Sequence, residues 1–135
     1  MRFAVPLLLA LVIAGCTSQG ATSSADKFTN SDQRAVAQKV EDLETAGKRN
    51  KPDDICSNIL AKQLVDQLNA AGTDCPTEMK KAIEDASDFD LEVVKVTVTG
   101  TTATAEVKRG KDGPTGPMTF SQENGDWRAT SLSAG

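Results

Sequence analysis

The chain has 135 residues, a formal net charge of −4, one Trp, and neither His nor Tyr. A general nucleic-acid-binding role is disfavoured, because there is no basic excess to neutralise phosphates. Once the N-terminal leader described next is set aside, the length favours one compact domain. Its core must come from Val, Leu, Ile, Ala and the four Phe.

The first sixteen residues have the layout of a secretory signal. Arg2 precedes an apolar run over residues 3–13, and two small residues then lead to Cys16. The run is too short to span a bilayer, which takes about 20 residues. The sequence therefore predicts that residues 1–15 are a signal peptide and that the protein is exported.

Residues 13–16, Ile-Ala-Gly-Cys, resemble the lipobox of bacterial lipoproteins. The resemblance implies a lipoprotein signal peptide, acyl groups on Cys16 and attachment to the bacterial cell membrane on its extracytoplasmic side. Two or more acyl chains anchor a protein stably. The alternatives are an ordinary secreted protein with Cys16 near the cut by chance, or an uncleaved anchor. Residues 16–28 are polar and small, and we expect a lipid-anchored flexible tether there, followed by a single α+β domain over residues 29–135.

A first helix is expected over residues 31–46, because apolar side chains recur there at helical spacing. Asn30 or Ser31 would cap its start, and Gly47 would end it. Three cations, Lys48, Arg49 and Lys51, follow the end of this helix. They could contact anionic lipid or a partner, but the preferred interpretation is that they complement the helix dipole and stay solvated.

A second helix is expected to begin at Pro52 and to continue to Gly72, with a break near Ala61 or Lys62. A third would start at Pro76. Without the break, the chain could not fold back and bring the starts of these two helices together.

Two cysteines, Cys56 and Cys75, remain once Cys16 is assigned to lipid. In an oxidising compartment the simplest interpretation is a structural disulfide. A metal site is a weak alternative in a chain without His, and a redox-active pair would normally be spaced Cys-x-x-Cys. We expect neither a cofactor nor a metal.

Alternating apolar residues from Phe89 onward predict four antiparallel strands. The inward phase changes between Val93 and Val94, which predicts a bulge. Later strands are expected over residues 102–109, 118–122 and 127–132, joined by a loop over residues 110–116 and by a primed two-residue turn at residues 124–125. The loop lacks the ending of a phosphate-binding loop.

Helices followed by hairpin-connected strands predict an α+β fold in which N-terminal helices pack on a curved four-stranded antiparallel sheet. The helical hairpin with Cys56 and Cys75, the segment 96–101 before an alanine-rich strand, and Gly-Asp-Trp-Arg at residues 125–128 resemble small bacterial lipoproteins of the nuclear-transport-factor-2-like, cystatin-like group. The resemblance implies a cone-like pocket between sheet and helix, a core ring at Trp127 and a solvated cation at Arg128. The alternative is a cystatin-like sheet over one helix, with the other helices peripheral.

The resemblance implies that enzymes of that group line the pocket with catalytic carboxylates, His or Tyr. This chain departs from them because it has neither His nor Tyr, so a general base would have to be Asp or Glu. Asp85, Asp88 and Asp90 could suggest a base or a calcium site, but they lack the glycine and distal Glu of a calcium loop. Ala103 and Ala105 could open a cavity, although close approach of a helix is the preferred interpretation. We expect no catalytic residues.

The predicted function is therefore that of a non-enzymatic, membrane-anchored lipoprotein whose domain binds a partner. The preferred partner is an envelope protein, which predicts an exposed apolar patch or groove and no deep polar cavity. The alternative is a small apolar ligand, which predicts an enclosed apolar pocket with a few polar groups. A diverged enzyme requires a buried Asp or Glu facing a cavity.

Overall fold

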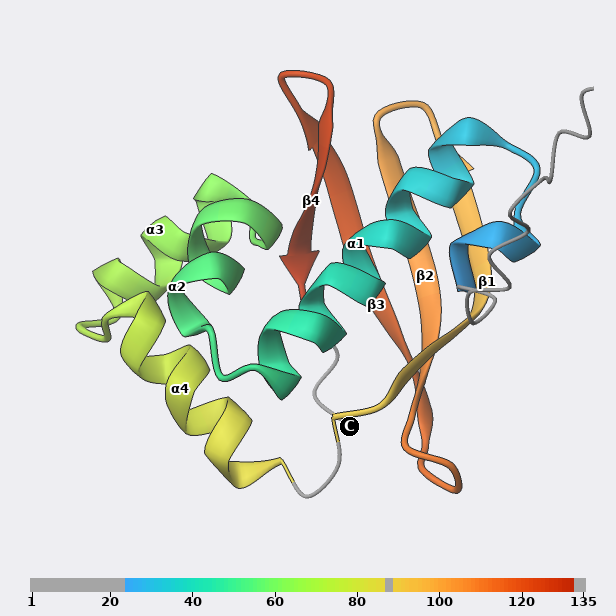
Figure 1. Cartoon of the computed structure of the whole chain (residues 1–135). Helices are drawn as coiled ribbons and strands as arrows, with labels where there is room; N and C mark the ends of the chain where they lie inside the picture. The colour runs from blue at the N-terminus through green and yellow to red at the C-terminus, as the bar shows by residue number, and fades with distance from the viewer. Residues whose placement is uncertain (1–23, 87–88, 133–135) are drawn as a thin grey trace, which may run out of the picture.

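The computed structural model describes residues 24–86 and 89–132 (Figure 1). The predicted signal peptide, Cys16 and Asp88 lie outside the described residues. The helical elements are η1 (Ser24–Lys27), α1 (Ser31–Lys48), α2 (Pro52–Asp54), η2 (Ile55–Ile59), α3 (Lys62–Ala70) and α4 (Cys75–Asp85). The strands are β1 (Leu91–Thr99), β2 (Thr102–Arg109), β3 (Thr115–Glu123) and β4 (Asp126–Ser131).

The four strands form one antiparallel sheet in the order β1-β2-β3-β4. The predicted α+β class is confirmed. Helix α1 lies across one face of the sheet, while α2, α3 and α4 are grouped beside the β4 edge (Figure 1). Inward-facing side chains of the sheet and the buried face of α1 make a common core, to which η2 adds Ile55 and Ile59 and α4 adds Cys75.

Two predicted irregularities of the sheet are confirmed. The register of β1 against β2 shifts between Val93 and Lys95, and this leaves Val94 exposed. Asn124 and Gly125 have φ values of 52° and 80°. Two successive positive φ values characterise the primed turn that matches the twist of a hairpin.

The N-terminus of α1 is capped as predicted, since the Asn30 side chain accepts hydrogen bonds from the backbone of Asp32 and Gln33. The predicted end at Gly47 was wrong, because the helix continues to Lys48. Asn50, with φ of 52°, takes the left-handed position instead. Its N–H donates to the Gly47 carbonyl, and the next N–H donates to the carbonyl of Ala46. These two bonds form the Schellman motif that ends many helices.

The folded part of the chain begins earlier than predicted. We expected a flexible tether as far as residue 28, but Ser24–Lys27 forms the 3-10 helix η1, which packs on α1 and β1. Ala25 is 2% exposed, and its N–H donates to Glu41 Oε1 over 3.1 Å. The small and polar residues of this segment are typical of a linker, but in the structure the segment is held in place by its contact with α1.

The predicted interruption of the second helix is confirmed at Leu60 and Ala61. The π-helical turn η2 ends just before these residues. Leu60 forms a parallel bridge with Ala129, and the Ala61 N–H donates to the Ala129 carbonyl. The break lets the chain fold back, and the Cys56–Cys75 disulfide joins η2 to the first residue of α4.

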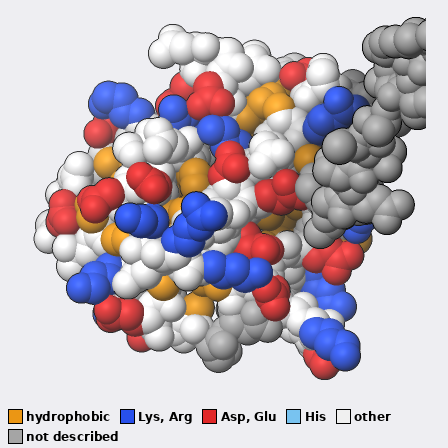
Figure 2. All heavy atoms as spheres, viewed as in Figure 1, with side chains coloured by type: hydrophobic (Ala, Val, Ile, Leu, Met, Phe, Trp, Pro, Cys, Tyr) orange, Lys and Arg blue, Asp and Glu red, His pale blue; other side chains and the backbone are white. Residues whose placement is uncertain are grey.

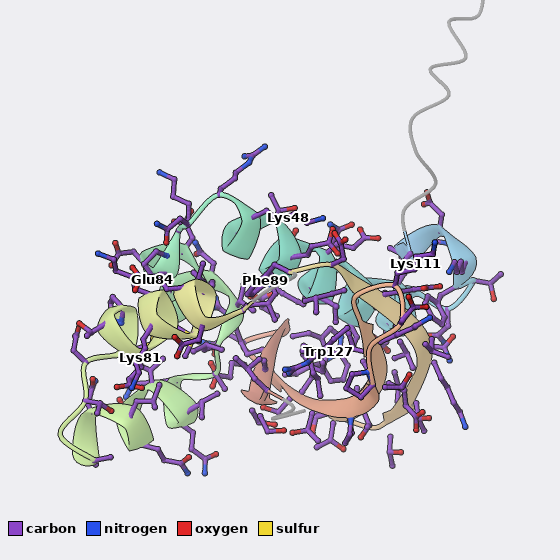
Figure 3. All side chains as sticks on the ribbon, turned by 90° about the horizontal axis from the view of Figure 1, so that it is seen from below. Lys48, Lys81, Glu84, Phe89, Lys111 and Trp127 are labelled. Atoms are coloured by element: carbon purple, nitrogen blue, oxygen red, sulfur yellow. A yellow bond between two sulfur atoms is a disulfide. The ribbon has the colours of Figure 1, made fainter. Side chains whose placement is uncertain are left out.

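The last strand supplies the predicted core ring, since Trp127 is 3% exposed and lies within the curve of the sheet (Figure 3). The expectation that Arg128 is solvated was wrong. Its Nη1 donates to the Ser57 carbonyl over 2.7 Å, and its Nε donates to Asp126 Oδ2 over 2.8 Å. Arg128 therefore fastens η2 to β4, because it satisfies a carbonyl that the α-helical pattern leaves free.

Candidate ligand pocket

An apolar pocket of about 300 Å³ lies between α4 and the rest of the domain. Its lining comes from α1, η2, α4, three strands and the segments that follow α4 and β4. This volume is at the lower end of the range for small-molecule sites. A pocket therefore lies between the helices and the sheet, and α4 forms its outer wall.

Helix α4 presents its apolar face to the pocket through Met79, Ala82, Ile83 and Ala86. The helix begins where Asp74 caps it, with its carboxylate accepting from the Thr77 N–H and hydroxyl. It packs on α2, η2 and α3. Together with the disulfide at its first residue, these contacts hold α4 in place while its apolar face borders the pocket.

The inner wall consists of side chains that also belong to the core or pack against it. Ile55 and Met118 are almost fully buried, so the floor of the pocket is rigidly packed. The wall residues are Leu43, Ile55, Leu91, Met118 and Leu132.

Phe89 stands between α4 and the sheet (Figure 3), and its ring also lines the pocket. The ring lies so close to α1 that a Cβ atom on Gly47 would overlap it. Gly47 is therefore required for this close approach, which explains a glycine inside the last turn of α1. Its presence positions one side of the pocket.

Arg109, the last residue of β2, is the one charged residue among those lining the pocket. Within residues 24–86 and 89–132, its guanidinium has no hydrogen-bond or ion-pair partner, although its backbone N–H donates to the Pro114 carbonyl. The same residue lines an open hollow formed by the β2–β3 loop and the end of α4. Arg109 thus stands where the apolar pocket meets a polar surface.

Neither Asp85 nor Asp90 lines the pocket. Asp85 borders the open hollow, and Asp90 pairs with Lys48. Hydrogen bonds to Asp90 and to Glu44 raise the pKa of the Lys48 ammonium above its ordinary value. In the described part of the chain, no group of three His, Cys, Asp or Glu is placed to hold a metal ion.

Ala103 and Ala105 are 4% and 0% exposed and belong to the core beneath α1. They do not line the pocket. Their small size therefore serves the close approach of a helix, as preferred from the sequence.

Sequence reasoning missed Arg109 and the wall on α4. The signal on α4 is the helical spacing of four apolar residues, Met79, Ala82, Ile83 and Ala86, which predicts an apolar helix face but not what that face borders. That face packs only partly, since Ala82 and Ala86 remain exposed. Arg109 carried no distinguishing signal, because a cation at the end of a strand is ordinary.

Comparison with protein-family models, with curated proteins and with solved structures finds no match. No helix in the described residues is long and apolar enough to cross a membrane.

Proposed function

We propose that this protein is an exported bacterial lipoprotein, anchored to the extracytoplasmic face of the membrane through acyl groups on Cys16, whose domain binds a small, mainly apolar molecule. The apolar pocket beside α4 is the observation that carries the binding role. The leader, ending in Ile-Ala-Gly-Cys at residues 13–16, supports the anchoring role.

The surface supports a small ligand better than a protein partner. In the described residues, Val94 is the exposed large hydrophobic side chain, at 55%, and one such residue does not make a docking patch. On the face shown in Figure 2, Lys and Arg side chains are interspersed with Asp and Glu. Neither an apolar nor a strongly charged area therefore dominates that face.

The pocket also supports binding rather than catalysis. A general base must reach its substrate from within the site. Among the described residues, no carboxylate lines the pocket and no charged side chain is buried. The chemistry that the lining offers is apolar contact and one cation.

Filling the pocket should abolish binding of an apolar probe. In Ala82→Phe, the ring would take up space beside Met79 and Ile83, so octanol binding measured by titration calorimetry should weaken at least tenfold. Ala70→Phe makes the same exchange on α3, away from the pocket, and should bind octanol like the wild type. Equal binding by both variants, or no binding by the wild type, would contradict the proposed pocket function.

Anchoring is tested separately at Cys16. The mature wild-type protein is expected to begin at Cys16, to carry acyl groups in its intact mass and to sediment with membranes, because several acyl chains anchor stably. Cys16→Ser should carry no acyl group, whereas Thr17→Ser should be acylated normally. A wild-type protein without acyl groups, or one found in the cytosol, would rule out the lipoprotein proposal.

A further inference from the structure

The apolar pocket meets a polar, open hollow at Arg109. Its interior is lined by hydrocarbon, and Arg109 lies at the boundary with the open hollow beside the β2–β3 loop. A guanidinium stays charged at all physiological pH values and presents several donors in a planar fork. Within the described ranges it has no partner for these donors, so a ligand atom can use them.

We infer that the ligand is an amphipathic monoanion, with its hydrocarbon in the pocket and its carboxylate at Arg109; this inference rests on the proposed pocket function. Carboxylates match the guanidinium geometry and bind it through two parallel hydrogen bonds. Because the protein has a net charge of −4, attraction of an anion must come from a local cation such as this one.

The charges around the hollow limit the headgroup. Besides Arg109, the hollow is lined by Lys111 and by two carboxylates, Asp85 and Asp112. Two cations and two carboxylates give no net charge, so the hollow offers no excess of positive charge to favour a doubly charged phosphate over a single carboxylate. A single carboxylate needs only the Arg109 fork, from which it can accept two parallel hydrogen bonds.

The volume limits the hydrocarbon. A liquid water molecule takes up about 30 Å³, so a pocket of about 300 Å³ holds roughly ten non-hydrogen atoms. Medium-chain carboxylates are of this size. Octanoate is a suitable probe, and octanol is its neutral counterpart.

The test compares the two probes on the full chain carrying Cys16→Ser, which has no acyl group, with the Cys56–Cys75 bridge checked by mass. Octanoate should bind about tenfold more tightly than octanol, as one charge-assisted contact predicts. Arg109→Gln should bring octanoate binding down to the level of octanol binding, so that the tenfold difference between the two probes disappears. Lys81→Gln removes the same charge from the outside of α4 (Figure 3) and should keep the difference.

The outcomes separate the inference from the proposed function. Equal binding of octanoate and octanol by the reference protein would overturn the carboxylate inference and leave the apolar pocket intact. Loss of both probes in Arg109→Gln, with unchanged thermal unfolding, would also overturn it. Failure of the reference protein to bind either probe would overturn the pocket function itself.

Discussion

Replacing both Cys56 and Cys75 with Ala is expected to lower the free energy of unfolding by about 3 kcal/mol. The bridge closes a loop with a sequence separation of 19 residues, and loss of a native disulfide from a small secreted domain typically costs about 2–5 kcal/mol. Since domains of this size are stable by only about 5–15 kcal/mol, the loss is a large fraction. Urea unfolding followed by the fluorescence of Trp127 measures it.

Reduction of the wild type provides the matched control. Wild-type protein in dithiothreitol should unfold at nearly the same urea concentration as Cys56→Ala/Cys75→Ala, because both lack only the covalent link. A difference of less than about 1 kcal/mol between the oxidised wild type and the double variant would show that packing alone holds α4.

The exchange Phe120→Ala is expected to cost about 3–5 kcal/mol, as is typical for removing a buried ring. Phe120 is 2% exposed and lies in β3, with Ala103 and Ala129 as its register partners on either side. Its small neighbours cannot fill the space that the ring leaves. Urea unfolding again reports the change, because Trp127 is retained.

Val94→Ala is the control for that exchange. It also shortens an apolar strand residue, but Val94 is 55% exposed, so the expected loss is below about 1 kcal/mol. Comparable losses in the two variants would mean that the sheet face beneath α1 is not the stabilising core.

Local patterns predicted the parts of the fold that depend on neighbouring residues. Alternation of apolar side chains gave the strands, the phase change at Val93 gave the bulge, and Asn124-Gly125 gave the turn. The disulfide followed from counting cysteines once Cys16 was set aside. These features depend on backbone geometry and composition, which a single sequence carries.

Long-range contacts account for the errors. Gly47 resembles a helix end in the sequence. In the structure its lack of a side chain leaves room for the ring of Phe89, which lies forty-two positions later in the chain. The predicted tether includes Ala25, but the Ala25 N–H donates to the side chain of Glu41 on α1, sixteen positions later in the chain. The pocket could not be predicted residue by residue, because its lining comes from elements spread over the whole domain.

The position of the disulfide has a consequence for when the proposed binding site is complete. The bridge begins at the first residue of α4, the helix that forms the outer wall. Cytoplasmic thiols are kept reduced, so a chain exported as proposed would gain this link only after crossing the membrane. Helix α4, the outer wall of the pocket, would then be fully stabilised only on the side of the membrane where the ligand is to be bound.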